Sequence, residues 1–318
     1  MTDNPLIGIN TSFRDYITMK KRAAELHMDG NGLPDYAFAL DFELRKKLDS
    51  IPNFYNISRK IAATYSSRQL QIINQKALAV TPNQFPEVYA IGRACAKILG
   101  IGIPAIYILS DQTLNAYTYA TDDVEPMIVI HSALYERFTP GELKFVIGHE
   151  CGHIHNTHGI YGVMAQILIL GGAGALTDSG ISLGMFNLIL KGAVYALNAW
   201  MRAGEITCDR AGMICCERLE DSYTAEAKFM YGAAIGEHEI NLDEIMKQLN
   251  MQESNITRFE ELFNNHPVVA RRIAAEKYFA DCETLYKWRP DLMEAGRTLR
   301  SREQTDELCK RCVSIIKN

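Results

Sequence analysis

Hydrophobic residues in the first part of the chain recur with the spacing of helices. Tyr36, Leu40, Phe42, Leu44 and Leu48 have this spacing. Two prolines, at positions 34 and 52, mark the ends of the run. We therefore predict that residues 1–85 form a helical N-terminal layer.

The pattern changes after residue 86 and predicts one helix followed by a small sheet. The segment Glu87–Leu99 has helical periodicity and is stopped by Gly100 and Gly102. Short runs of β-forming residues, separated by turn residues, come next. They are Ala105–Leu109, Asn115–Ala120 and Met127–Ile130.

A strong helix-start signal follows at residues 139–142. Thr139 can cap the free amides, Pro140 suits the first helical position, and Glu142 completes a capping box. We predict a helix from here to about Asn156.

The interval from Thr157 to Met201 is almost without charge, because Asp178 and Lys191 are its only charged residues. Its apolar residues form two helical pieces, broken at residues 178–180, and predict a helical hairpin. The pieces are Ile160–Leu176 and Ile181–Trp200.

The remaining chain is also mainly helical. Helical periodicity continues to about Asp221 and resumes at Arg271–Cys282, and the charged residues 283–318 form a helical extension without an assigned role. The prediction is a predominantly helical α+β fold with a catalytic region over residues 86–282.

Composition limits the classes of function. Of the 318 residues, 47% are hydrophobic and 22% are charged, which is typical of a folded globular protein. The net charge of −5 gives no general attraction for nucleic acid. The N-terminus lacks the pattern of a secretory signal, so we expect a cytoplasmic protein with its eight cysteines as thiols.

Candidate chemistry lies in His149-Glu150-Cys151-Gly152-His153, within the helix that begins near Thr139. Helical positions four apart share a face, so both imidazoles can bind one Zn²⁺ while Glu150 faces the water on the metal. About one chain in a hundred of this composition contains H-E-x-x-H by chance. The motif alone therefore leaves open a polar helix end with solvated histidines.

A catalytic zinc site needs a third protein ligand. The best candidate is Glu205, beyond the hairpin, with Asp209 four positions later on the same helical face. We predict that Glu205 binds zinc and that Asp209 holds a histidine ligand from behind. An ordinary amphipathic helix with exposed acids is the alternative.

With these residues the chain resembles the zinc metallopeptidases of gluzincin type that include HtpX and the CAAX prenyl endopeptidases. The likeness extends from about residue 86 to 280 and implies a zincin-like catalytic domain with one zinc ion. Its motifs are H-E-x-x-H at residues 149–153; R-x-x-E-x-x-x-D at Arg202, Glu205 and Asp209; Asn115-Ala116-Tyr117; and His266-Pro267 followed by Arg272-Ile273.

The resemblance implies peptide hydrolysis with zinc held by His149, His153 and Glu205, and with Glu150 as the general base. By resemblance, His266 would stabilise the oxyanion, and the strand at Asn115 would bind an extended substrate. The alternatives are that His266 is only a histidine at a helix boundary and that the strand at Asn115 is only a buried strand. Met201 and Cys208 depart from the family pattern and leave open the packing around the third ligand.

Two further histidines, His155 and His158, crowd the end of the predicted zinc helix. We expect them to be solvated rather than metal-bound, since the fourth zinc position must stay open. Cys309 and Cys312 have C-x-x-C spacing but no second pair, so they predict neither a zinc ribbon nor a redox fold.

The hairpin over residues 160–200 leaves membrane contact open. Its two arms approach the ~20 residues that cross a bilayer. Gln166, Asn187, Lys191 and the glycines at 171–174 favour burial against the protein instead.

We therefore predict a zinc metalloendopeptidase that acts on peptide or protein substrates. The alternative is a catalytically weak, chaperone-like or interaction module on the same fold. The complete ligand set together with Glu150 favours the enzyme.

Overall fold

The computed structural model describes residues 27–29, 33–121, 124–171, 183–231, 241, 244, 247 and 269–314. Within these ranges, the side chains at 124, 168–171, 183–194 and 231 lie outside the description. His266 and the middle of the predicted hairpin, residues 172–182, also lie outside it.

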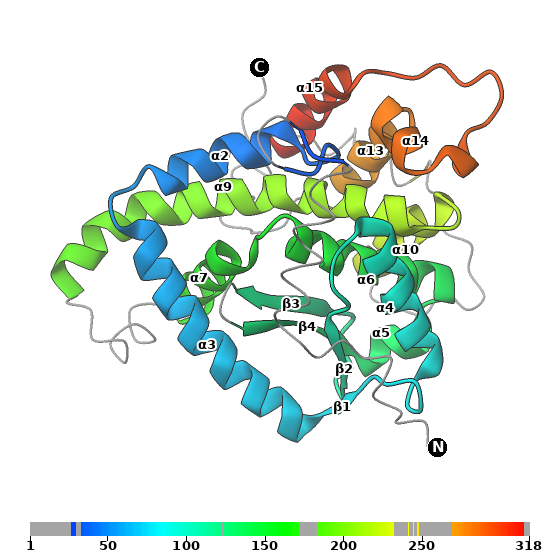
Figure 1. The fold of residues 1–318 in the computed structure, drawn as a ribbon. Helices are drawn as coiled ribbons and strands as arrows, with labels where there is room; N and C mark the ends of the chain where they lie inside the picture. Colours follow the sequence, from blue (N-terminus) through cyan, green and yellow to red (C-terminus); the bar gives the residue numbers. More distant parts are fainter. Residues whose placement is uncertain are drawn as a thin grey trace.

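A small mixed sheet lies at the centre of the described chain (Figure 1). Its order is β1-β2-β4-β3, with β2 parallel to β4 and both outer strands antiparallel to their neighbours. Residues 127–130 of β4 are fully buried, as expected for an inner strand. The strands are β1 (Ala77–Ala79), β2 (Ala105–Leu109), β3 (Ala116–Thr121) and β4 (Val124–His131).

Helix α6 (Pro140–His155) starts at the predicted capping box. The hydroxyl of Thr139 accepts a hydrogen bond from the backbone N of Glu142 at 3.3 Å, and the Glu142 carboxylate accepts one from the backbone N of Thr139 at 2.7 Å. Most residues of α6 are buried, so this helix lies largely inside the molecule.

Helix α9 (Leu183–Cys215) packs along α6 (Figure 1). Glycines make this packing close. A Cβ at Gly148 would lie 2.7 Å from the Cβ of Cys215, and one at Gly152 would lie 2.8 Å from the Cβ of Ala211. The absence of side chains at these positions therefore sets the distance between the two helices.

Two N-terminal helices cover the outer side of these elements. Helix α2 (Ala39–Asp49) lies along α9, and α3 (Phe54–Lys76) packs on α7 (Gly159–Gly171) and β3. Phe54, Tyr161 and Trp200 belong to one apolar cluster between these elements.

The remaining helices complete the other side. Helix α4 packs on α6, and α13 packs on α10 and α15. All eight cysteines are buried free thiols, in agreement with the composition. The bounds are α4 (Pro86–Leu99), α5 (Ser132–Arg137), α10 (Glu220–Tyr231), α13 (Val269–Ala280), α14 (Glu283–Trp288) and α15 (Arg302–Val313), with a 3₁₀ turn at Pro290–Leu292.

The predicted fold class, α+β and predominantly helical, is confirmed. Several elements differ from the predictions. Strand β1 was not predicted, because three residues directly after a helix carry too little periodicity. Asn115 precedes β3 instead of starting it, and α9 continues through Trp200 to Cys215. Gly204 and Gly212 lie within this stretch, packed against His158 and Phe145, and do not end the helix.

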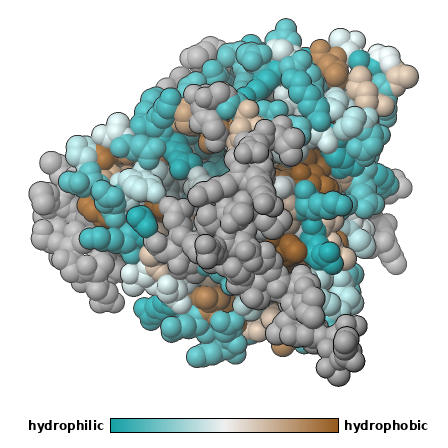
Figure 2. All heavy atoms as spheres, in the orientation of Figure 1, coloured by the Kyte–Doolittle hydropathy of each residue, from teal (hydrophilic) through white to brown (hydrophobic). Residues whose placement is uncertain are grey.

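No helix among the described residues is both long and apolar enough to cross a membrane. On the face that Figure 2 shows, hydrophobic residues appear as small separate groups among hydrophilic ones. The large exposed apolar side chains of the described chain are Leu78, Tyr195, Met230 and Met293.

Candidate metal centre

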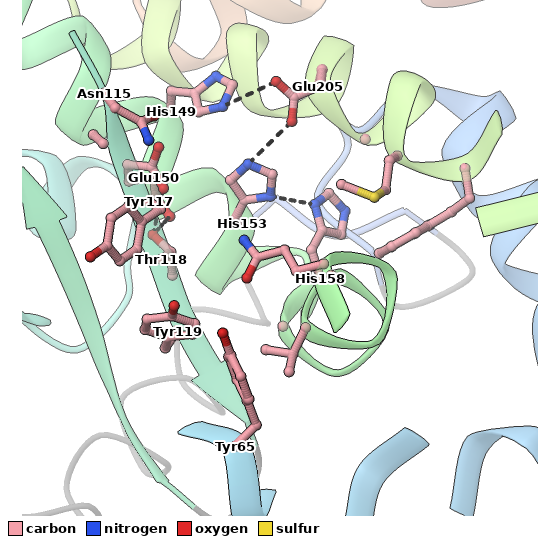
Figure 3. A pocket seen from close by; sticks show the side chains of 18 residues that line it. Tyr65, Asn115, Tyr117, Thr118, Tyr119, His149, Glu150, His153, His158 and Glu205 are labelled. Atoms are coloured by element: carbon pink, nitrogen blue, oxygen red, sulfur yellow. Dashed lines mark hydrogen bonds and ion pairs between the residues drawn. The ribbon is translucent and has the colours of Figure 1, made fainter. Parts of the chain in front are cut away.

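Three side chains that the sequence analysis singled out converge between α6 and α9. The Nε2 atom of His149 lies 3.8 Å from one carboxylate oxygen of Glu205, and the Nε2 atom of His153 lies 3.6 Å from the other (Figure 3). The histidines are four residues apart on α6, and Glu205 faces them from α9.

These donors fit a zinc ion. Bonds of about 2.0–2.1 Å place neighbouring ligands of tetrahedral zinc about 3.4 Å apart, close to the separations between Glu205 and the two imidazoles. Two imidazoles and a carboxylate are also the donor set of one class of catalytic zinc site, which keeps a fourth position for water or substrate.

Charged residues surround the Nδ1 side of the His149 ring. Its Nδ1 atom donates a hydrogen bond to Asp209 at 2.9 Å. Burial disfavours a charge on this imidazole, but the hydrogen bond to Asp209 and the charges of Glu205 and Asp209 outweigh that effect and raise the pKa of His149 to about 9. Asp209, predicted to hold a histidine, thus contacts His149 in the structure.

Arg272 of α13 balances this negative charge. Its Nε atom donates to Asp209 at 2.9 Å, and its guanidinium also makes an ion pair with Glu226 of α10 at 2.9 Å and lies 3.7 Å from Glu205. Burial opposes the charge on Asp209, yet Arg272 and His149 hold the pKa of that carboxyl below its usual range. The sequence motif contained Arg272 but assigned it no role.

Glu150 contacts a residue that sequence reasoning missed. The hydroxyl of Thr118, on β3, donates to the Glu150 carboxylate at 2.6 Å (Figure 3). Thr118 lies three positions after Asn115. A hydroxyl residue inside the predicted edge strand was therefore the sequence signal that could have indicated this contact.

The expectation that His155 and His158 are solvated is wrong. Both side chains are buried. The Nδ1 atom of His155 lies 3.0 Å from the hydroxyl of Tyr36, and the Nδ1 atom of His158 lies 3.1 Å from the Nδ1 atom of His153. The N-terminal helices cover the end of α6, and no local sequence pattern predicts that packing.

Two cavities flank the centre. The larger, of about 470 Å³, is lined by Tyr65 of α3, Tyr117 and Tyr119 of β3, and residues of α7 and α9. The smaller, of about 230 Å³, lies toward Phe145, Phe229 and Arg272. Both are lined by Asn115, Ala116, His149, Glu150 and Glu205.

The other predicted site residues fall in different places. Asn115, Ala116 and Tyr117 all lie beside the centre, whereas Arg202 is buried on α9 one turn before Glu205. His266 is outside the described residues.

Cys208 offers a second candidate ligand set, because its sulfur and nitrogens of His149 and His153 lie within 4.8 Å of one another. Burial and nearby carboxylates raise the pKa of this thiol well above its usual value, whereas metal binding needs the thiolate. Its sulfur also lies 3.5 Å from His158. Glu205 stays the predicted third ligand, because two imidazoles and a carboxylate are the donor set of a catalytic zinc site.

A comparison with models of protein families identifies the family to which this chain belongs. Residues 82–279, well over half of the chain, match the model of peptidase family M48. The chain belongs to peptidase family M48. Membership confirms the resemblance to HtpX-like metallopeptidases and implies a metal cofactor for the M48 centre.

Curated relatives agree with this family. The plastoglobule-localized metallopeptidase 48 of Arabidopsis thaliana is 27% identical over 67% of this chain and 60% of its own length. An HtpX protease homolog of Acaryochloris marina is 30% identical over 30% of this chain and 33% of its own. An HtpX protease homolog of Bifidobacterium longum is 24% identical over 65% of this chain and 75% of its own length. This chain therefore covers less than two thirds of the length of the first two relatives.

Proposed function

We propose that the protein is a zinc-dependent metalloendopeptidase. The observation that carries this proposal is the convergence of His149, His153 and Glu205, with Glu150 beside them and its carboxylate held by Thr118. Membership of a peptidase family supports the same class of reaction.

A zinc ion bound here would act as a Lewis acid and would lower the pKa of its water to about 7. Glu150 would serve as the general base, which takes a proton from the attacking water and returns it to the leaving amine. Thr118 keeps the Glu150 carboxylate in one orientation. By resemblance, His266 stabilises the oxyanion, and we retain that assignment as part of the proposal.

The substrate is a peptide or protein segment in extended form. Strand β3 is at one edge of the described sheet and borders both cavities, so a peptide can add to it by backbone hydrogen bonds. The cavities on both sides of the centre would hold residues on both sides of the cleaved bond. That arrangement supports an endopeptidase.

We place the enzyme in the cytoplasm, without nucleic acid as a partner. Residues 160–200 are the segment through which membrane contact would occur. Partition of the full-length protein between soluble and carbonate-washed membrane fractions tests this placement.

Cleavage of internally quenched peptides tests the enzyme, with Glu150→Gln as the matched variant. We expect Glu150→Gln to keep zinc and to lose most activity, and Glu205→Ala to lose most of the zinc. Equal cleavage by the unsubstituted protein and Glu150→Gln, unchanged by chelators, would contradict the proposal. Zinc binding without cleavage by either protein would favour the interaction module.

A further inference from the structure

His158 connects a candidate zinc ligand to the N-terminal helix α2. Its Nδ1 atom lies 3.1 Å from the Nδ1 atom of His153, and its Nε2 atom lies 3.0 Å from a carboxylate oxygen of Asp41. Figure 3 shows the rings of His153 and His158 side by side, with Glu205 on the far side of His153. Asp41, His158, His153 and Glu205 thus form one continuous row of polar contacts.

The Asp41–His158 end of this row is closed off from water. Asp41 and His158 are each 4% exposed. The His158 ring packs edge-on against Trp200 at 5.3 Å, and a Cβ at Gly204 would lie 3.3 Å from it. A hydrogen bond made in such surroundings meets little competition from water.

The Asp41 carboxylate is itself held in place. The hydroxyl of Thr207, on α9, donates to the same Asp41 oxygen at 2.7 Å, and accepts from the backbone N of Phe38 at 3.2 Å. The segment that starts α2 is therefore tied to α9 at the point where His158 meets the carboxylate.

Hydrogen-bond chemistry assigns the protons along the row. An ionised carboxylate only accepts, so the Nε2 atom of His158 carries the proton that bonds to Asp41. In the neutral ring the Nδ1 atom of His158 is then an acceptor and takes a hydrogen bond from the Nδ1–H of His153. The Nε2 atom of His153 is left with its lone pair directed to the side where Glu205 lies.

The opposite placement of the protons would prevent His153 from binding a metal. If the Nδ1 atom of His158 donated instead, the proton of neutral His153 would sit on Nε2, where a metal must bind. Asp209 performs the corresponding task for His149 directly, with a carboxylate on the Nδ1 atom. For His153 the carboxylate acts through a second imidazole.

We propose that Asp41 and His158 are positioning residues that fix the tautomer of His153 and thereby set the zinc affinity of the centre. This inference rests on the zinc site of the proposed function. It gives the N-terminal helix α2, which precedes the region matched by the family model, a role in metal binding.

Zinc affinity of the metal-free full-length protein, measured by competition with a chromophoric chelator, tests the proposal. We expect Asp41→Asn to weaken zinc binding by about tenfold to a hundredfold. The matched control is Asp49→Asn on the same helix. Asp49 accepts a hydrogen bond from Tyr161 of α7 at 2.7 Å and is outside the row, so this variant should bind zinc as the unsubstituted protein does.

Thr207→Val provides a second variant if Asp41→Asn does not fold. It leaves the charge of Asp41 but removes the hydroxyl that holds the carboxylate, so zinc affinity should fall by a smaller factor. Unchanged zinc affinity in Asp41→Asn, or in Thr207→Val where Asp41→Asn does not fold, would overturn the proposal and leave the enzyme class standing. Failure of the unsubstituted protein to bind zinc would overturn both.

Histidine tautomers give a readout that a purely structural role of Asp41 would not change. In ¹⁵N-labelled, zinc-loaded protein we expect His158 to carry its proton on Nε2 and His153 to carry its proton on Nδ1. Asp41→Asn should shift His158 toward a mixture of tautomers. A proton on the Nδ1 atom of His158 in the unsubstituted protein would contradict the assignment.

Discussion

A hydroxyl from another element contacts the carboxylate of Glu150. Thr118 on β3 donates to the Glu150 carboxylate at 2.6 Å, while Glu150 itself belongs to α6. The orientation of Glu150, the proposed base, therefore depends on how the sheet edge packs against the helix.

Thr118→Val is expected to lower kcat by about tenfold to a hundredfold, because a hydrogen bond to a charged group contributes about 1.5–3 kcal/mol. Steady-state cleavage of a quenched peptide measures the effect. Thr118→Ser keeps the hydroxyl and serves as the control. Equal kcat values for Val and Ser at this position would show that Thr118 does not align the base.

Zinc uptake is expected to release a proton from His149. In the metal-free protein its pKa is about 9, so at pH 7.5 the imidazole is protonated and must lose that proton to bind a metal. Calorimetric titration with zinc in two buffers of different ionisation heat measures the release. Identical heats in the two buffers would contradict the expectation.

The same pKa determines how the stability of the metal-free protein changes with pH. Because the folded value for His149 lies above the unfolded value of about 6.5, its contribution to metal-free stability is fully present below about pH 6.5 and is lost as the pH rises through about 9. Asp209→Asn removes the main stabilising partner and should flatten this dependence in urea unfolding curves.

At the scale of elements, the centre depends on the close packing of α6 and α9. Gly148 and Gly152 lie on one face of α6, against Cys215 and Ala211. On the same two helices the histidines face Glu205. The distance between the helices therefore also sets the distance between the ligands.

Gly152→Ala is expected to destabilise the fold by about 1–3 kcal/mol, because its Cβ would lie 2.8 Å from Ala211. It should also weaken zinc binding by forcing the helices apart. Gly162→Ala on α7 is the control, since nothing lies within 4 Å of its added Cβ. Urea unfolding compares the two, and equal stabilities would refute the role of the close contact.

Gly162 also lines the larger cavity, together with Tyr65, Tyr119 and Val163. Gly162→Leu would place an apolar side chain in open space there. We expect cleavage of peptides with a bulky apolar residue next to the cleaved bond to fall more than cleavage of peptides with alanine there. Paired peptides that differ only at this residue measure the ratio, and an unchanged ratio would exclude the cavity as a substrate subsite.

At the scale of the whole molecule, a buried ion pair joins three distant segments. Arg210 of α9 lies 2.7 Å from Asp306 of α15 and donates to the backbone O of Tyr36 at 3.1 Å. Asp306 also accepts from the backbone N of Ala39 at 3.3 Å. The start of α2 and the C-terminal helix are thus both attached to the helix that carries Glu205.

Asp306→Asn is expected to lower the free energy of unfolding by about 3–5 kcal/mol, because it leaves the buried Arg210 without its counter-charge. Asp291→Asn removes the exposed partner of Arg289 and should cost less than about 1 kcal/mol. Chemical denaturation of both variants measures the difference. Similar losses would show that burial of the Arg210 pair does not control its energy.

The local parts of the fold and site were predictable from sequence. The capping box at Thr139 involves residues three apart, and the shared face of His149 and His153 follows from the helical repeat. The four-residue spacing of Glu205 and Asp209 on one helical face also predicted them, and the structure brings both to the histidines. Strand β1 and the burial of His155 and His158 were missed because they depend on neighbours far along the chain.

The sequence by itself determined that two imidazoles and a carboxylic acid share one helix, since helical geometry relates residues one to four apart. Only the tertiary structure decided what holds those groups. Thr118 reaches Glu150 from β3, Arg272 reaches Asp209 from α13, and Asp41 reaches His158 from α2. The physical reason is that these contacts depend on the packing of separate elements, which no local pattern encodes.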